Sequence, residues 1–62
     1  MTINATKIET LLAKRCMTKA ELARKCGISR QNISTIVLRG TCEPKTAGKI
    51  AVGLGVQVEE IL

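Results

Sequence analysis

The sequence is constrained most strongly at residues 27–29, where one helical pattern must stop and another must start. Gly27 stands where a helix often adopts a left-handed C-cap, and Ile28 can make the hydrophobic contact that accompanies such a cap. Ser29 can cap a new helix at once, because its hydroxyl can accept a hydrogen bond from a backbone N–H of the first turn. Two helices therefore meet across a turn of about three residues, which is the connection of a helix-turn-helix motif.

Apolar periodicity on both sides of this turn predicts an all-α fold. Thr18 and Glu21 have the spacing of a capping box at the start of the helix before the turn, and Asn4 or Thr6 can cap an earlier helix. Pro44 suits the first turn of a later helix, where its missing N–H costs nothing. We predict a compact bundle of about five short helices, over residues 4–16, 18–26, 30–39, 44–54 and 58–62.

Two glycines fall inside the predicted helix over residues 44–54, and each costs up to about 1 kcal/mol relative to alanine. Close approach of another helix would explain Gly48. The sequence offers no explanation for Gly53.

The chain has 62 residues and no aromatic side chain, so we expect one domain, residues 1–62, with a thin aliphatic core. Modules that stack single-stranded bases on exposed aromatic rings are excluded. No segment has the length of a membrane span or the pattern of a secretory signal, and we expect a cytoplasmic protein that does not bind membranes. Three cysteines without a CxxC motif fit a reducing compartment.

Patterns for catalysis and for metal binding are missing from the sequence. It contains no His, no Asp and no glycine-rich phosphate loop, so we predict no enzyme activity, metal, cofactor or small-molecule ligand. The cysteines are interpreted as small apolar core residues. Cys42, next to Glu43, is predicted to be the only exposed thiol, and a redox-sensing role for it is an alternative hypothesis.

The charge of the chain favours a polyanionic partner. Ten Lys and Arg residues against five Glu residues give a formal net charge of +5. A Lys-rich solvated surface explains the charge alone equally well. The distribution is uneven, however, because residues 14–49 contain only Glu21 and Glu43 as acids. The basic residues of this stretch are Lys14, Arg15, Lys19, Arg24, Lys25, Arg30, Arg39, Lys45 and Lys49.

The predicted helix over residues 30–39 carries side chains that can read bases. Ile33 marks its inward face, and the helical period then turns Gln31, Thr35 and Leu38 outward. Arg pairs with guanine, Gln and Asn pair with adenine, and Thr can contact the thymine methyl group. A polar first turn after a cap is the simpler alternative. The face also lacks acidic residues, which DNA would repel, and we predict base reading by Arg30, Gln31, Asn32 and Thr35.

Phosphate contacts are predicted near the helix starts and along the flanks of this face. Free backbone N–H groups and the positive end of the helix dipole attract anions there. Each basic residue taken singly is more often a solvated surface charge than a contact. The predicted backbone contacts are Lys19, Ser34, Arg39, Lys45 and Thr46.

Residues 18–36, TKAELARKCGISRQNISTI, resemble the Cro/C1-type (XRE-like) helix-turn-helix family, as does the later run LGVQVEEIL. The resemblance implies a lambda-repressor-like bundle whose third helix enters the major groove, commonly as a homodimer on the half-sites of a double-stranded DNA operator. By position, Arg30, Gln31 and Thr35, with Asn32 beside them, match the family's base-reading sites, and Lys19 matches a residue that touches phosphate or a base edge. In many members a Glu follows the last apolar residue of the third helix, and a Gly comes two residues later. Here Val37, Leu38 and Arg39 precede Gly40, so this segment is one residue longer and has no Glu.

Two classes of function remain open at this point. The first is a sequence-specific transcriptional regulator of the phage-repressor or Cro type that binds duplex DNA, with an antitoxin-like or excisionase-like accessory protein as a variant. The second is a helix-turn-helix module that binds an acidic protein. Larger apolar anchors on the helix over residues 30–39 would favour the second class, whereas the Arg, Gln and Thr found there favour DNA.

Overall fold

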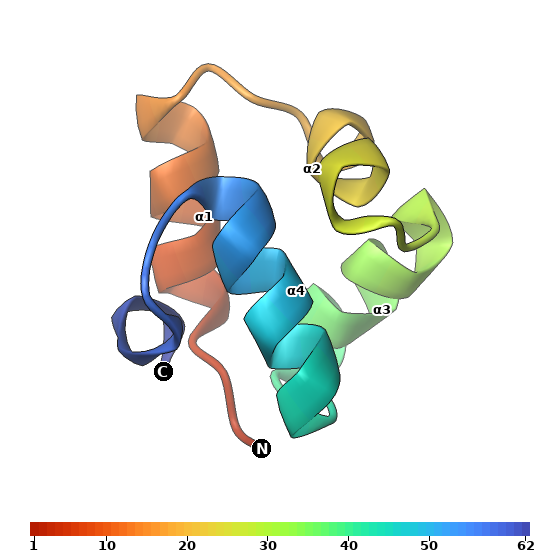
Figure 1. Cartoon of the computed structure of the whole chain (residues 1–62), viewed down its shortest axis with the longest axis vertical. Helices are drawn as coiled ribbons and strands as arrows, with labels where there is room; N and C mark the ends of the chain where they lie inside the picture. Colours follow the sequence, from red (N-terminus) through yellow and green to blue (C-terminus); the bar gives the residue numbers. More distant parts are fainter.

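Four α-helices and a final 3₁₀ helix account for most of the chain (Figure 1). The structure is a computed structural model that describes all 62 residues. It confirms the predicted all-α fold, with the last helix a single 3₁₀ turn. None of the helices is both long enough and apolar enough to cross a lipid bilayer. The elements are α1 (Ala5–Lys14), α2 (Lys19–Cys26), α3 (Arg30–Arg39), α4 (Pro44–Leu54) and η1 (Val58–Ile61).

Side-chain caps fix where the first three helices begin. The side chains of Asn4, Thr18 and Ser29 each accept a hydrogen bond of 3.1 Å from the backbone N–H three residues later. Glu21 completes the predicted capping box, because its carboxylate accepts a hydrogen bond from the backbone N–H of Thr18 at 3.2 Å. Asn4, and not Thr6, is the N-cap of α1. Each helix start therefore follows from a local sequence signal.

The core is aliphatic and contains no buried polar side chain. Helix α4 lies across the middle of the molecule, with α1 on one side and α2 and α3 on the other (Figure 1). Helix α2 packs against both α3 and α4, and η1 packs against α1 and α4. These helices thereby enclose a single cluster of buried apolar side chains. Its largest fully buried side chains are Ile8, Leu22, Ile33, Ile50, Leu54 and Ile61.

Helix α4 lies close to α2 at Gly53. A Cβ atom there would lie 2.5 Å from Sγ of Cys26 and 3.1 Å from Cδ1 of Leu22. A Cβ atom at Gly48 would meet nothing within 4 Å. The suggestion that a close helix contact explains Gly48 is therefore wrong, and the explanation belongs to Gly53, for which the sequence offered none.

The first residues of the chain pair with the loop between α3 and α4. The backbone N–H of Ile3 donates to the carbonyl of Gly40 at 2.9 Å, and the N–H of Cys42 donates to the carbonyl of Met1 at 3.0 Å. Ile3 is itself buried in the core. This short antiparallel pairing, which nothing in the sequence pattern indicated, fixes the loop that leads into α4.

We expect Gly53→Ala to lower the free energy of unfolding by about 1–3 kcal/mol, because the added methyl group overpacks the α2–α4 contact. Gly48→Ala is the matched control in the same helix. It should raise the stability by about 0.5–1 kcal/mol, since its methyl group meets open space and alanine favours helix. Urea denaturation followed by circular dichroism measures both. Equal effects of the two substitutions would contradict the proposed role of Gly53.

Candidate nucleic-acid interface

The turn between α2 and α3 has the geometry that the sequence predicts. Gly27 ends α2 in the left-handed region, at φ 71°, and its N–H donates to the carbonyl of Ala23. The N–H of Ile28 donates to the same carbonyl at 3.1 Å, and the Ile28 side chain packs against the core. Ser29 then caps α3. The turn thus ends one helix and starts the next without a free loop.

One side of α3 is anchored in the core and the opposite side faces solvent. Ile33 is only 1% exposed, and Ile36 and Val37 are half-buried beside it. No acidic residue lies on α3. The helix therefore presents a polar surface that is free of negative charge. The exposed side chains of α3 are Arg30, Gln31, Asn32, Ser34, Leu38 and Arg39.

Thr35 lies on the edge of this exposed surface and is half-buried. Its hydroxyl donates to the backbone carbonyl of Gln31 at 2.9 Å. The hydroxyl proton is thus used inside the helix. The hydroxyl oxygen can still accept a hydrogen bond, and the methyl group can make an apolar contact.

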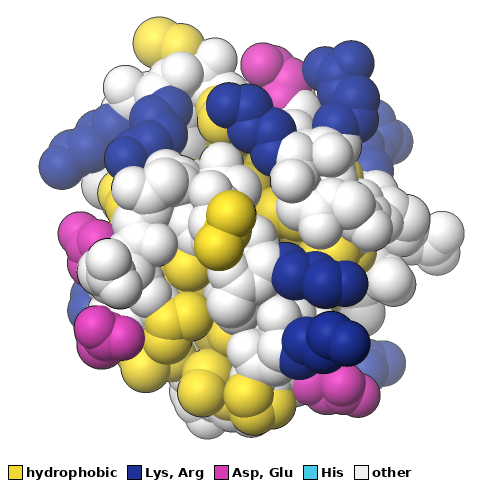
Figure 2. Space-filling model, in the orientation of Figure 1, with side chains coloured by type: hydrophobic (Ala, Val, Ile, Leu, Met, Phe, Trp, Pro, Cys, Tyr) yellow, Lys and Arg dark blue, Asp and Glu magenta, His cyan; other side chains and the backbone are white.

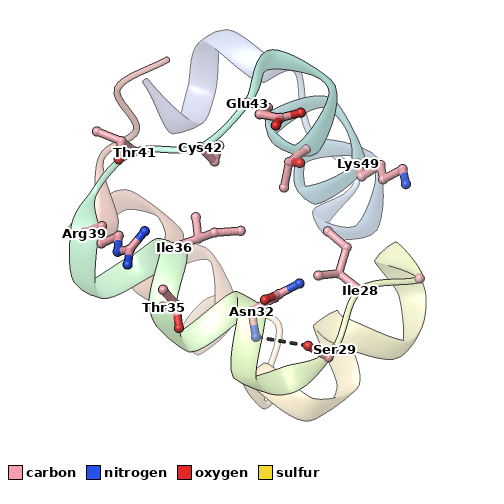
Figure 3. A pocket seen from close by; sticks show the side chains of 12 residues that line it. Ile28, Ser29, Asn32, Thr35, Ile36, Arg39, Thr41, Cys42, Glu43 and Lys49 are labelled. Atoms are coloured by element: carbon pink, nitrogen blue, oxygen red, sulfur yellow. Dashed lines mark hydrogen bonds between the residues drawn. The ribbon is translucent and has the colours of Figure 1, made fainter.

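A groove opens along one flank of α3 (Figure 3). Its walls come from the α2–α3 turn, α3, the loop after α3 and the first turns of α4. Of the nine predicted DNA contacts, the groove brings four together: Asn32, Thr35, Arg39 and Thr46. The other five, Arg30, Gln31, Ser34, Lys19 and Lys45, lie outside it, with the first three on the exposed surface of α3.

Lys19, at the start of α2, has an acidic neighbour. Its Nζ lies 3.6 Å from Oε1 of Glu9 on α1, and both side chains are substantially exposed. An exposed ion pair of this kind contributes about 0–1 kcal/mol, so Lys19 can turn from Glu9 toward another anion at small cost.

The groove also contains residues that were not predicted as contacts. Glu43 and Lys49 line it from the loop and from α4, and Ile28 lies at one end (Figure 3). Their position depends on how the loop of residues 40–43 folds back toward α3. The sequence marked Ile28 as a contact of the helix cap, Lys49 as part of the basic stretch and Glu43 as the residue before the helix-starting Pro44, but none of these signals placed them in one groove.

Positive charge spreads widely over the molecule. In Figure 2, Lys and Arg side chains occupy much of the upper half and the right side of the view, while hydrophobic side chains gather at the lower left. A broad positive field raises the rate of encounter with a polyanion but does not by itself choose an orientation.

The environments of the three thiols correct one prediction. Cys42 is half-buried in the groove wall, whereas Cys16 is exposed and Cys26 is buried. Cys16 follows α1 in a left-handed conformation, at φ 49°, outside the packed bundle. Cys42 is partly covered because the first residues of the chain pair with its backbone. Cys42 is therefore not the only accessible thiol.

No group of His, Cys, Asp or Glu side chains is arranged to hold a metal ion.

Comparison with protein-family models gives one match. The model described as a Cro/C1-type HTH DNA-binding domain, HTH standing for helix-turn-helix, matches residues 7–62. The match includes the α2–α3 turn, all of α3 and the groove residues. Searches of curated proteins and of solved structures gave no match.

We expect alkylation near pH 8 to modify Cys16 first, Cys42 more slowly and Cys26 only when the protein opens. Burial raises the pKa of the Cys42 and Cys26 thiols above the usual value, which lowers the fraction of reactive thiolate at that pH. Mass spectrometry of peptides after timed alkylation gives the order. Faster modification of Cys42 than of Cys16 would contradict the structure of the loop.

Proposed function

The chain belongs to the Cro/C1-type HTH DNA-binding family, and on this premise we propose that it is a sequence-specific transcriptional regulator of the phage-repressor or Cro type. The observation that carries the proposal is the exposed surface of α3, which is polar, lacks acidic residues and is presented by the Gly27–Ser29 turn. In this proposal α3 enters the major groove of duplex DNA, whose width admits an α-helix.

Four side chains of α3 are assigned to base reading. Arg30 and Gln31 lie in the first turn, where a helix entering the groove by its amino end brings side chains to the base edges. Arg30 can pair with guanine, and Gln31 and Asn32 with adenine. The methyl group of Thr35 can contact thymine, since its hydroxyl proton is already bonded within the helix.

Five further residues are assigned to the DNA backbone. Lys19 lies in the first turn of α2, and Lys45 and Thr46 lie in the first turn of α4. Ser34 and Arg39 flank the base-reading surface on α3. Contacts of this kind set the register of the protein on the duplex and carry no sequence information directly.

We also propose that the protein binds its operator as a homodimer. One 62-residue module offers few contacts, and two linked copies multiply them when each occupies one half-site. Half-sites for such proteins lie about 34–36 Å apart, one turn of the double helix.

A second candidate function is docking of a protein partner. Leu38 favours it, because this apolar side chain on α3 is 88% exposed. Interaction surfaces usually carry such anchors. The neighbouring exposed residues are polar or basic, which is why DNA binding is the leading proposal.

The test is selection from a pool of random duplexes at two salt concentrations, with Gln31→Ala and Lys19→Ala beside the wild type. We expect the wild type to enrich a motif with inverted half-sites. Gln31→Ala should enrich a more degenerate motif, because one base contact is lost. Lys19→Ala should keep the motif but bind every duplex more weakly, with a salt slope reduced by about 1.

Two outcomes would contradict this proposal. Equal changes in motif and affinity for the two variants would overturn the separate roles of Gln31 and Lys19. Failure of the wild type to enrich any motif, with weak and salt-sensitive binding only, would favour the protein-docking function.

A further inference from the structure

Glu43 places a negative charge on the groove beside the base-reading surface. It is exposed, and it lines the groove together with Asn32 and Arg39 of α3 and Thr46 of α4. In Figure 3 its carboxylate lies on the rim of the groove, across the opening from Asn32 and Arg39. Of the four α-helical N-caps, it is the only acidic one.

The carboxylate of Glu43 has no partner within the protein. The single ion pair of the structure joins Lys19 and Glu9, so no Lys or Arg neutralises Glu43. Its side chain also accepts no capping hydrogen bond from α4, in contrast to the caps of α1, α2 and α3. No hydrogen bond or ion pair of the carboxylate therefore holds the helix start.

The backbone nevertheless keeps Glu43 in this position. Its carbonyl accepts a hydrogen bond from the N–H of Ala47 at 2.9 Å, the first bond of α4. Pro44 follows it and fixes the entry into the helix. The loop before it is tied to the first residues of the chain through Cys42. The backbone position is therefore fixed at the rim of the groove, while the exposed carboxylate can rotate about its own side-chain bonds.

We propose that Glu43 limits the affinity of the protein for duplex DNA by repelling phosphate from this groove. The inference rests on the proposed function, in which α3 and the start of α4 face DNA. A carboxylate on the rim of the groove that Arg39 and Thr46 also line opposes the approach of the DNA backbone to these two residues. It acts on every sequence alike, so it weakens binding to operator and to unrelated DNA without changing the base preference.

The test compares Glu43→Gln with Glu59→Gln on one unrelated duplex and on the selected duplex. Each substitution changes the formal net charge from +5 to +6, because each removes one acidic residue. Glu59 is exposed on η1 and does not line the groove, so it is the control for net charge alone. Glu43→Asp keeps the charge and serves as the conservative variant. Thermal unfolding of each protein establishes that it is folded.

At about 50 mM salt we expect Glu43→Gln to bind both duplexes about three- to tenfold more tightly than the wild type. Glu59→Gln should differ from the wild type by less than about twofold, and Glu43→Asp should remain as weak as the wild type. The gain of Glu43→Gln should shrink at about 200 mM salt, where the repulsion is screened.

The proposal is overturned if Glu43→Gln and Glu59→Gln behave alike, since the effect is then one of net charge. It is equally overturned if Glu43→Gln binds the selected duplex more weakly, because the carboxylate then accepts a hydrogen bond from a base. Both results leave DNA binding intact. Failure of every folded variant to bind either duplex overturns the proposed function itself, and this inference with it.

Discussion

The left-handed backbone at Gly27 is the constraint on which the rest of the structure depends. At φ 71° it ends α2 and lets Ser29 cap α3 two residues later. A side chain with a Cβ atom is strained in that conformation, so glycine is the residue that suits it. Once α3 leaves the turn in this direction, Ile33 enters the core and the opposite side of the helix must face solvent. The polar surface of α3 is thus a consequence of how the chain turns.

Two long-range contacts complete the surface around α3. Gly53 allows α4 to lie close to α2, and the pairing of Ile3 with Gly40 holds the loop between α3 and α4. The groove lies where the loop between α3 and α4 and the start of α4 flank α3. The groove mixes basic and polar side chains with one carboxylate, that of Glu43. The proposed limit on DNA affinity depends on the local balance of these charges as well as on their sum.

Local signals in the sequence predicted the helices well. The caps at Thr18 and Ser29 and the stop at Gly27 depend on residues within one helical turn, and the structure confirms all three. What was missed depends on residues far apart in the chain. The role of Gly53 follows from the position of Cys26, and the partial burial of Cys42 follows from pairing with the first residues. The place of Glu43 in the groove likewise depends on how the loop folds back, which helical periodicity does not describe.

We propose that the surface of α3 exposed by the Gly27 turn is what contacts DNA. Nuclear magnetic resonance of ¹⁵N-labelled protein, titrated with a selected duplex, tests it most directly. We expect the largest changes in amide chemical shift at residues 29–36, and little change at residues 52–55, where α4 ends at the far side of the bundle from its start (Figure 1). Large changes at residues 52–55 with residues 29–36 unaffected would contradict it.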